Sequence, residues 1–225
     1  MAFDFDGTLA DTFPWFASVL NDVADRYRFR RVDEAEGEAL RGLDARAVLR
    51  RLGIPGYKLP FIARHMYTLA AANIDGVRLF PGVPRLLDEL DAAGIVLAVV
   101  SSNREDNVRR ALGPEAAGRI RHFACGASLF GKGKRMRRLV RKAGVPPGAV
   151  LAIGDEIRDG EAAREAGCAF AAVAWGYTRA PALAAWGAAP VFATPDAIAP
   201  YVLGAGYCPA RAPGTGEALP LPNGS

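Results

Sequence analysis

Two carboxylates, Asp4 and Asp6, stand two residues apart at the end of a short apolar segment, and Gly7 and Thr8 follow them directly. Successive side chains of a strand alternate between its faces. Gly7, however, can adopt backbone conformations that are closed to other residues, so Asp4 and Asp6 can address one small site. Crowded carboxylates repel each other unless a cation neutralises them, and Mg2+ with oxygen ligands is the usual solution. The residues therefore predict a metal-dependent acidic site near the start of the chain.

Further polar side chains follow later apolar segments, at 95–100, at 149–153 and around Phe123. These polar residues are Ser101, Ser102, Asn103, Lys132, Asp155 and Asp159. The carboxyl ends of parallel strands meet at one edge of a sheet, where ligands bind. We therefore expect four distant segments to bring carboxylates, hydroxyls and an amine to one place.

The elements that must position these groups alternate between helix and short apolar strand beyond Phe80. We expect strands at 95–100, 122–125, 149–153, 168–174 and 191–193, and helices at 83–93, 104–112, 134–143 and 160–166. Apolar runs of this kind are typical of strands covered on both faces. Repeated strand and helix units build a parallel sheet between two helical layers, so the predicted fold class is α/β, a three-layer Rossmann-like core.

The segment between the first strand and this core is helical in pattern. Apolar residues recur at helical spacing from Phe13 onward, and shorter periodic pieces lie at 34–40, 45–52 and 59–72. Glycine and proline separate these pieces. The predicted organisation is a core of residues 1–11 and 78–204, a small inserted helical cap at 12–77, and a disordered tail at 205–225, which is rich in Pro, Gly and Ala.

In this order the motifs resemble those of the haloacid dehalogenase superfamily of phosphohydrolases, and within it the phosphoglycolate phosphatase-like members. The stretch 4–11, DFDGTLAD, is similar to the first motif, Ser101 to the second, Lys132 to the third, and Gly154-Asp155 with Asp159 to the fourth. The resemblance covers about residues 3 to 200. Several motifs in one order are more specific than any of them alone.

The resemblance implies a Mg2+-dependent phosphatase that acts on a small phosphorylated metabolite, phosphoglycolate-like, through an aspartyl-phosphate. Asp4 would attack phosphorus, and Asp6 would protonate the leaving oxygen and later deprotonate water. Lys132 would offset the negative charge. Mg2+ would be held by Asp4, by the backbone carbonyl of Asp6 and by Asp155. Asp159 would not bind the ion directly but would contact these ligands. Implied substrate-binding residues are Thr8, Ser101, Ser102 and Asn103.

The inserted helices resemble the cap that closes over the site in this superfamily and excludes water. A small helical cap favours small metabolites over polymers as substrates. Arg41, Gly42 and Arg46 lie in a loop between two cap helices and are candidates to meet a distal anion of the substrate.

Several alternatives stay open on the sequence. Asp155 and Asp159 could be helix-capping acids, and Ser101 to Asn103 could cap the helix that follows them. Lys134 competes with Lys132 for the catalytic role, although Lys132 is favoured because it precedes the helix. Residues 175–177 could line the site or pack in the core. The alternative functions are a phosphomutase or phosphonatase on the same scaffold, or a non-catalytic phosphate-binding or signalling module.

Composition and charge limit the partners and the cellular location that we expect. The net charge of +4, from 28 basic and 24 acidic residues, is too mild to demand a nucleic-acid partner, and the basic residues of 134–142 fit a solvated helix face. No apolar run reaches the length of a membrane span, so we expect no membrane partner. Three widely spaced cysteines fit a reducing environment, and we expect a cytoplasmic protein. The sequence does not indicate the oligomeric state, the natural substrate or the metabolic pathway.

The first strand is unusually short. Only Met1, Ala2 and Phe3 precede Asp4, whereas the superfamily's first strand starts several residues earlier. A central parallel strand gains from a longer apolar run. We therefore expect an apolar N-terminal extension to raise the melting temperature.

Overall fold

The protein is described by a computed structural model that covers residues 1–126 and 131–204. The tail predicted at 205–225 lies outside the described residues. In the described part, no helix is long and apolar enough to cross a membrane.

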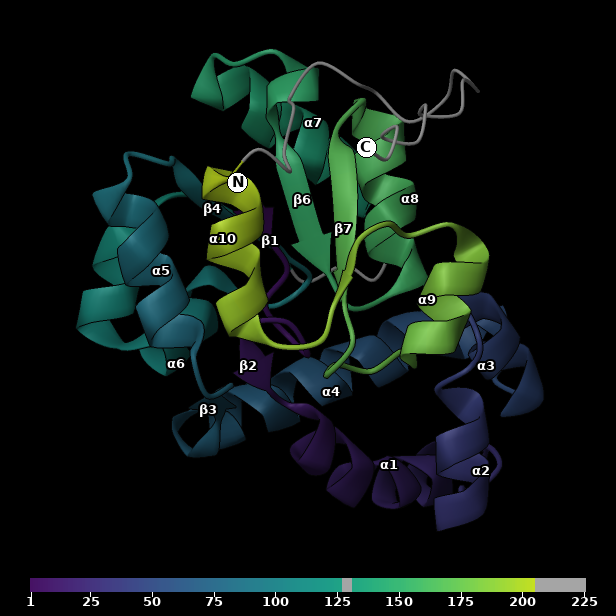
Figure 1. The fold of residues 1–225 in the computed structure, drawn as a ribbon. Helices are drawn as coiled ribbons and strands as arrows, with labels where there is room; N and C mark the ends of the chain where they lie inside the picture. Colours follow the sequence, from purple (N-terminus) through teal and green to yellow (C-terminus); the bar gives the residue numbers. More distant parts are fainter. Residues whose placement is uncertain (127–130, 205–225) are drawn as a thin grey trace.

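Six strands form one parallel sheet in the order β5-β4-β1-β6-β7-β8 (Figure 1). They are β1 (Ala2–Phe3), β4 (Leu97–Ser101), β5 (Ile120–Cys125), β6 (Leu151–Gly154), β7 (Ala169–Val173) and β8 (Val191–Phe192). The predicted α/β class is confirmed, and the strand expected at 191–193 is an edge strand.

Strand β1 lies at the centre of the sheet although it is assigned only two residues. Phe3 pairs with Val99 of β4 on one side and with Ile153 of β6 on the other. Hydrogen bonds extend the ladder in both directions, from Ala98 N to the Met1 carbonyl (2.9 Å) and from Asp4 N to the Ile153 carbonyl (2.8 Å). Asp4 is therefore fixed to the neighbouring strand by its own backbone.

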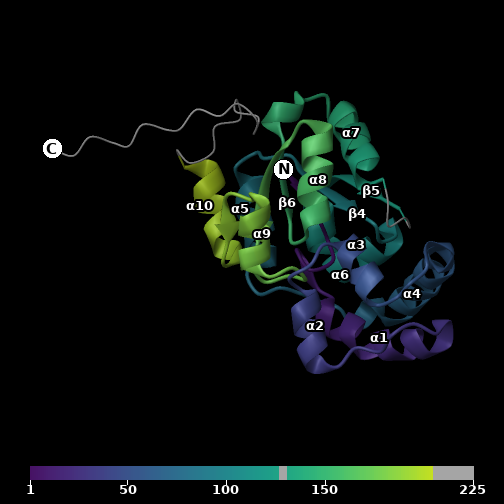
Figure 2. The same cartoon turned by 90° about the vertical axis from the view of Figure 1, so that its right-hand side faces the viewer.

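Helices cover both faces of the sheet (Figure 2). One face carries α5 (Val83–Ala92), α6 (Glu105–Arg119) and α10 (Ile198–Leu203), and the other carries α7 (Lys132–Ala143) and α8 (Ile157–Ala166). Side chains of a strand alternate between faces. Phe3 accordingly packs in the first layer and Ala2 in the second.

Two short helices and one kink were not predicted. Helix α9 (Ala180–Trp186) and helix α10, of seven and six residues, lie in stretches for which the sequence predicted no element. Helix α6 was expected to end at Leu112 but continues to Arg119 through a break at Gly113, whose φ of 72° is followed by Pro114.

The inserted helices lie at the carboxyl ends of the strands in both views (Figures 1 and 2). They are α1 (Phe13–Tyr27), α2 (Glu34–Leu40), α3 (Ala45–Arg51) and α4 (Leu59–Asn73). The chain enters this group through β2 (Ala10–Asp11) and leaves through β3 (Arg78–Leu79), and the two strands pair antiparallel. Asp33 and Asp44 cap α2 and α3 by accepting hydrogen bonds of 2.8 Å from backbone N–H groups.

Candidate active site

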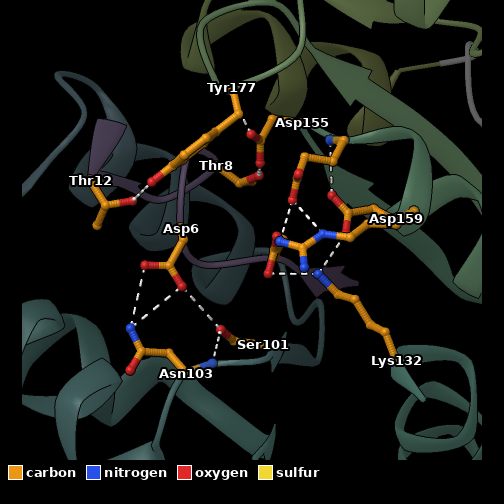
Figure 3. A network of polar contacts seen from close by, with 12 residues as sticks. Asp6, Thr8, Thr12, Ser101, Asn103, Lys132, Asp155, Asp159 and Tyr177 are labelled. Atoms are coloured by element: carbon orange, nitrogen blue, oxygen red, sulfur yellow. Dashed lines mark hydrogen bonds and ion pairs between the residues drawn. The ribbon is translucent and has the colours of Figure 1, made fainter. Parts of the chain in front are cut away.

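Polar side chains from five strand ends converge at one place (Figure 3), on the side of the sheet where the inserted helices lie (Figures 1 and 2). Asp4 and Asp6 follow β1, Ser101 ends β4, and Lys132 opens α7 after β5. The segment from Asp155 follows β6, and Tyr177 follows β7. The convergence that the motif order predicted is therefore present, with one further strand contributing.

Lys132 joins two carboxylates at the centre of this group. Its Nζ lies 2.7 Å from Asp4 Oδ1 and 2.6 Å from Asp159 Oδ1, and all three side chains are buried. Burial alone would lower the pKa of Lys132, but Asp159 and Asp4 outweigh burial and raise that pKa. Lys134, the competing candidate, is exposed. Lys132 is thus the lysine that contacts Asp4.

Lys132 does not fully compensate for the burial of the Asp4 carboxyl group. Burial raises the pKa of Asp4 to about 7, and the nearby Asp159 carboxylate adds to the rise, although Lys132 and Arg158 oppose it. A carboxylate in this state is stabilised by a proton or by a cation.

Asp6 points into a separate polar environment (Figure 3). Ser101 Oγ donates to Asp6 Oδ2 at 3.4 Å, and Asn103 Nδ2 donates to Asp6 Oδ1 at 3.3 Å. Burial raises the pKa of Asp6, with the hydrogen bond from Asn103 opposing the rise. A raised pKa suits a group that gives and takes a proton. Asn103 also accepts from Arg104 N at 2.8 Å, but Arg104 is the N-cap residue of α6 and no described side chain caps this helix, so the capping alternative is not supported.

Asp155 is completely buried between two glycines. Its Oδ1 accepts from Thr8 Oγ1 at 2.7 Å and its Oδ2 from Tyr177 N at 2.8 Å. A Cβ atom at Gly7 would lie 2.3 Å from Asp155 Oδ2, and one at Gly176 would lie 2.2 Å from Asp155 Cβ. Only glycine permits this approach, and Gly7 additionally has a φ of +81°. Both carboxylate oxygens of Asp155 are therefore engaged within the protein.

The carboxylates that come close enough to share a metal ion differ from the set implied by resemblance. Oxygens of Asp4, Glu156 and Asp159 all lie within 4.8 Å of one another, whereas Asp155 and Asp6 are outside this group. Hydrogen bonds from Thr8 and Tyr177 hold the Asp155 carboxylate away from these three residues. Asp159 also accepts a hydrogen bond from Glu156 N at 3.0 Å, as part of a capping box. The same carboxylate therefore helps to cap α8 and also pairs with Lys132.

The chemistry of this donor set fits a hard divalent cation such as Mg2+. If all four carboxylates, of Asp4, Asp155, Glu156 and Asp159, were ionised, they would exceed the two nearby cations, Lys132 and Arg158, by two negative charges. Burial raises the pKa of Asp155 well above its usual range, and the Glu156 carboxylate adds to this rise. Oxygen ligands and an excess of negative charge are what Mg2+ requires.

The sequence assigned no role to Thr12, Glu156 or Arg158 and left 175–177 undecided. Trp175 Nε1 donates to the Thr8 carbonyl at 3.1 Å, and the Tyr177 hydroxyl lies 3.0 Å from Thr12 Oγ1. The segment therefore braces the loop after β1. The signal that could have found it is its place directly after a parallel strand.

Arg41 does not take the place expected of it. Its Nε donates to the Tyr177 carbonyl at 3.1 Å and its Nη2 to the Gly176 carbonyl at 2.8 Å, while its Nη1 pairs with Glu38. These donors join the inserted helices to the core, which corrects the expectation that Arg41 meets a distal anion. Lys58, the lysine relevant to the phosphonatase alternative, donates to the Tyr27 carbonyl at 2.8 Å.

Comparison with known proteins agrees with this geometry. Residues 1–173 match the family model of the haloacid dehalogenase-like hydrolases. A phosphoglycolate phosphatase from Synechococcus elongatus is 31% identical over 184 residues, 81% of this chain and 87% of the relative. An N-acetylmuramic acid 6-phosphate phosphatase from Pseudomonas aeruginosa is 28% identical over 189 residues, 78% of this chain and 81% of the relative. A solved structure described as a predicted phosphatase from Clostridium acetobutylicum shares the fold, with a TM-score of 0.77 at 16% identity, over 90% of this chain and 96% of that one.

Proposed function

This chain belongs to the haloacid dehalogenase-like hydrolases, and we propose that it is a Mg2+-dependent phosphatase for a small, phosphoglycolate-like phosphate monoester. The proposal rests chiefly on one contact, the buried ion pair between Asp4 and Lys132, beside which Asp6 stands in its own hydrogen-bonded environment. This arrangement supports separate proposed roles for Asp4 as nucleophile, Asp6 as proton carrier and Lys132 as the cation that offsets charge.

In the first step, Asp4 attacks phosphorus and forms an aspartyl-phosphate while the bond from phosphorus to the leaving oxygen breaks. Asp6 gives its proton to that oxygen, which its raised pKa favours. Lys132 offsets negative charge on Asp4 and on the transferring phosphoryl group. We propose that four further residues position the substrate or the groups around it, namely Thr8, Ser101, Ser102 and Asn103.

In the second step, Asp6 takes a proton from water, whose oxygen attacks phosphorus and releases phosphate from Asp4. Asp4, Glu156 and Asp159 would hold Mg2+, with Asp155 and the Asp6 carbonyl as the alternative ligands implied by resemblance. The ion, when bound, neutralises charge that the two protein cations leave uncompensated.

We further propose that residues 12–77 act as a cap that excludes water during the first step. Their attachment through β2 and β3 and their position over the strand ends support this role. A small metabolite, with no nucleic-acid or membrane partner, is the proposed substrate class. A cytoplasmic location is supported by Cys125 and Cys168, which are both free thiols.

Hydrolysis of p-nitrophenyl phosphate tests the mechanism. Asp4→Asn is expected to abolish turnover, and EDTA is expected to abolish it until Mg2+ is restored. Undiminished activity under either condition would contradict the aspartyl-phosphate mechanism or the metal dependence, respectively.

A further inference from the structure

Arg41, the C-cap residue of α2, joins the inserted helices to the segment that follows β7. Its Nε donates to the Tyr177 carbonyl at 3.1 Å and its Nη2 to the Gly176 carbonyl at 2.8 Å. In return, Arg179 N donates to the Arg41 carbonyl at 2.9 Å. These hydrogen bonds hold the end of α2 and the backbone of residues 176–179 together.

The same short segment also reaches the buried Asp155 carboxylate (Figure 3). Tyr177 N donates to Asp155 Oδ2 at 2.8 Å, and Thr8 Oγ1 donates to Asp155 Oδ1 at 2.7 Å. The Gly176 carbonyl and the Tyr177 N–H belong to one planar peptide group, so its oxygen and its hydrogen point in opposite directions. One peptide group is therefore bonded to the Arg41 guanidinium through its oxygen and to the Asp155 carboxylate through its hydrogen.

This peptide group is packed between the core and the inserted helices. A Cβ atom at Gly176 would lie 2.2 Å from Asp155 Cβ, so the backbone lies directly against the side chain of Asp155. The Tyr177 ring stands edge-on to Phe13 of α1, with 5.2 Å between the ring centres, and Arg41 Cζ lies 4.7 Å from the centre of the same Phe13 ring. Movement of α1 and α2 away from the core would withdraw both the ring contact and the two donors of Arg41.

The hydrogen bonds run in series from a cation to a carboxylate. Hydrogen bonds in series polarise one another, so a guanidinium on the Gly176 carbonyl makes the Tyr177 N–H a stronger donor to Asp155. Hydrogen bonds to ionised groups are also stronger than those between neutral groups. Loss of Arg41 is therefore expected to weaken a hydrogen bond in which Arg41 takes no direct part.

We propose that Arg41 is a positioning residue, which couples the docking of the inserted helices on the core to the placement of the Asp155 carboxylate. The peptide group between Gly176 and Tyr177 carries the coupling. Because coupling is reciprocal, the Asp155 carboxylate favours the docked helices as much as docking favours the observed place of Asp155. The relevance to catalysis rests on the proposed function, since Asp155 adjoins the proposed Mg2+ site, but the coupling itself is measured without turnover.

Amide hydrogen exchange, followed by NMR in the full chain in EDTA, measures the coupling in both directions. The Tyr177 N–H reports on its bond to Asp155, and the Arg179 N–H reports on the docking of α2. Arg41→Gln is expected to speed exchange at Tyr177 at least tenfold, and Asp155→Asn to speed exchange at Arg179 at least threefold. Arg41→Lys should restore slow exchange at Tyr177 only in part, because an ammonium lacks the planar fork that reaches two carbonyls.

Two controls separate this effect from a general loss of stability. Arg46, an exposed arginine in the first turn of α3, is the matched control, and Arg46→Gln should leave exchange at Tyr177 within twofold of the unmutated rate. The amide of Leu87, buried in α5 away from these contacts, should keep its exchange rate within twofold in every variant.

Faster exchange at Arg179 but not at Tyr177 in Arg41→Gln would overturn the proposal, because Arg41 would then join the two parts without positioning Asp155. Unchanged exchange at Arg179 in Asp155→Asn, or an equal acceleration at Leu87, would also overturn it. None of these rates depends on the proposed function, which is tested by hydrolysis of p-nitrophenyl phosphate by the unmutated protein. A chain that hydrolyses this ester but shows no coupled exchange would keep the function and lose the positioning role of Arg41.

Discussion

Lys132 and Asp4 form a buried ion pair of 2.7 Å across residues that are far apart in the sequence. The same ammonium reaches Asp159 at 2.6 Å, so one lysine holds the loop after β1 to the first turn of α8. Removing one partner of a buried pair leaves a charge without compensation and typically costs about 3–5 kcal/mol. The pair is therefore expected to affect stability as well as the proposed catalysis.

Lys132→Met is expected to lower kcat/KM for p-nitrophenyl phosphate by about 100-fold or more, because the charge on the phosphoryl group loses its offset. It is also expected to lower the melting temperature. Lys134→Met is the matched control, since Lys134 is exposed two residues away on the same helix, and it should change neither quantity. Equal losses in the two variants would mean that the contact with Asp4 has no special role.

Asp4→Asn is expected to change the pH dependence of stability in the metal-free protein. The pKa of Asp4 is about 7 in the folded chain against an ordinary value of 3.8, so between these values the folded state keeps a proton that the unfolded state has lost. Stability therefore falls as the pH rises from about 4 to 7, by an upper limit of roughly 4 kcal/mol. Asparagine lacks this proton, so the variant should not show this part of the fall.

Thermal melts in EDTA from pH 5 to pH 8 measure this effect. The melting temperature of Asp4→Asn minus that of the unmutated protein should grow as the pH rises from 5 to about 7 and should level off above that pH. Asp11→Asn, which removes an exposed carboxylate, provides the control and should follow the unmutated protein at every pH. Parallel curves for Asp4→Asn and the unmutated protein would contradict a raised pKa for Asp4.

Mg2+ is expected to raise the melting temperature of the metal-free protein, because an ion that binds only the folded state stabilises it by mass action. If Asp4, Glu156 and Asp159 hold the ion, Glu156→Gln should weaken the apparent Mg2+ affinity in a thermal-shift titration by about tenfold. Glu161→Gln, an exposed carboxylate on the same helix, should leave the affinity unchanged. Loss of the shift in Asp155→Asn but not in Glu156→Gln would restore the ligand set implied by resemblance.

The elements that local chemistry determines were predictable. Helix α2 begins and ends at the predicted residues because Asp33, directly before it, caps its first turn. The gathering of Asp4, Ser101 and Lys132 followed from one rule, that parallel strands end at a common edge. Neither inference required knowledge of a contact between distant residues.

The direction in which a side chain turns was not predictable, because distant residues decide it. Asp155 turns toward Thr8, which is 147 residues away in the sequence, and this leaves Glu156 beside Asp4. Arg135 was placed by helical spacing on a solvated face, yet its side chain is half-buried, and its charge acts on Tyr67 of the inserted helix α4. Helical period cannot show what packs over a helix terminus.

An apolar extension of β1, such as Lys-Val-Ile-Val before Met1, is expected to raise the melting temperature by several degrees. The Met1 amine donates to the Val96 carbonyl at 2.5 Å, and burial lowers the pKa of that amine to about 6, so a buried chain end now occupies a place where a strand would continue. Val96 is 50% exposed beside it, and added residues would cover this surface. About 1 kcal/mol shifts the melting temperature of a domain of this size by roughly 2–4 °C. An extension of equal length, Lys-Ser-Gly-Ser, also removes the terminal amine from this place but adds no apolar surface. Equal melting temperatures for the two extensions would show that longer apolar pairing in the central strand adds no stability.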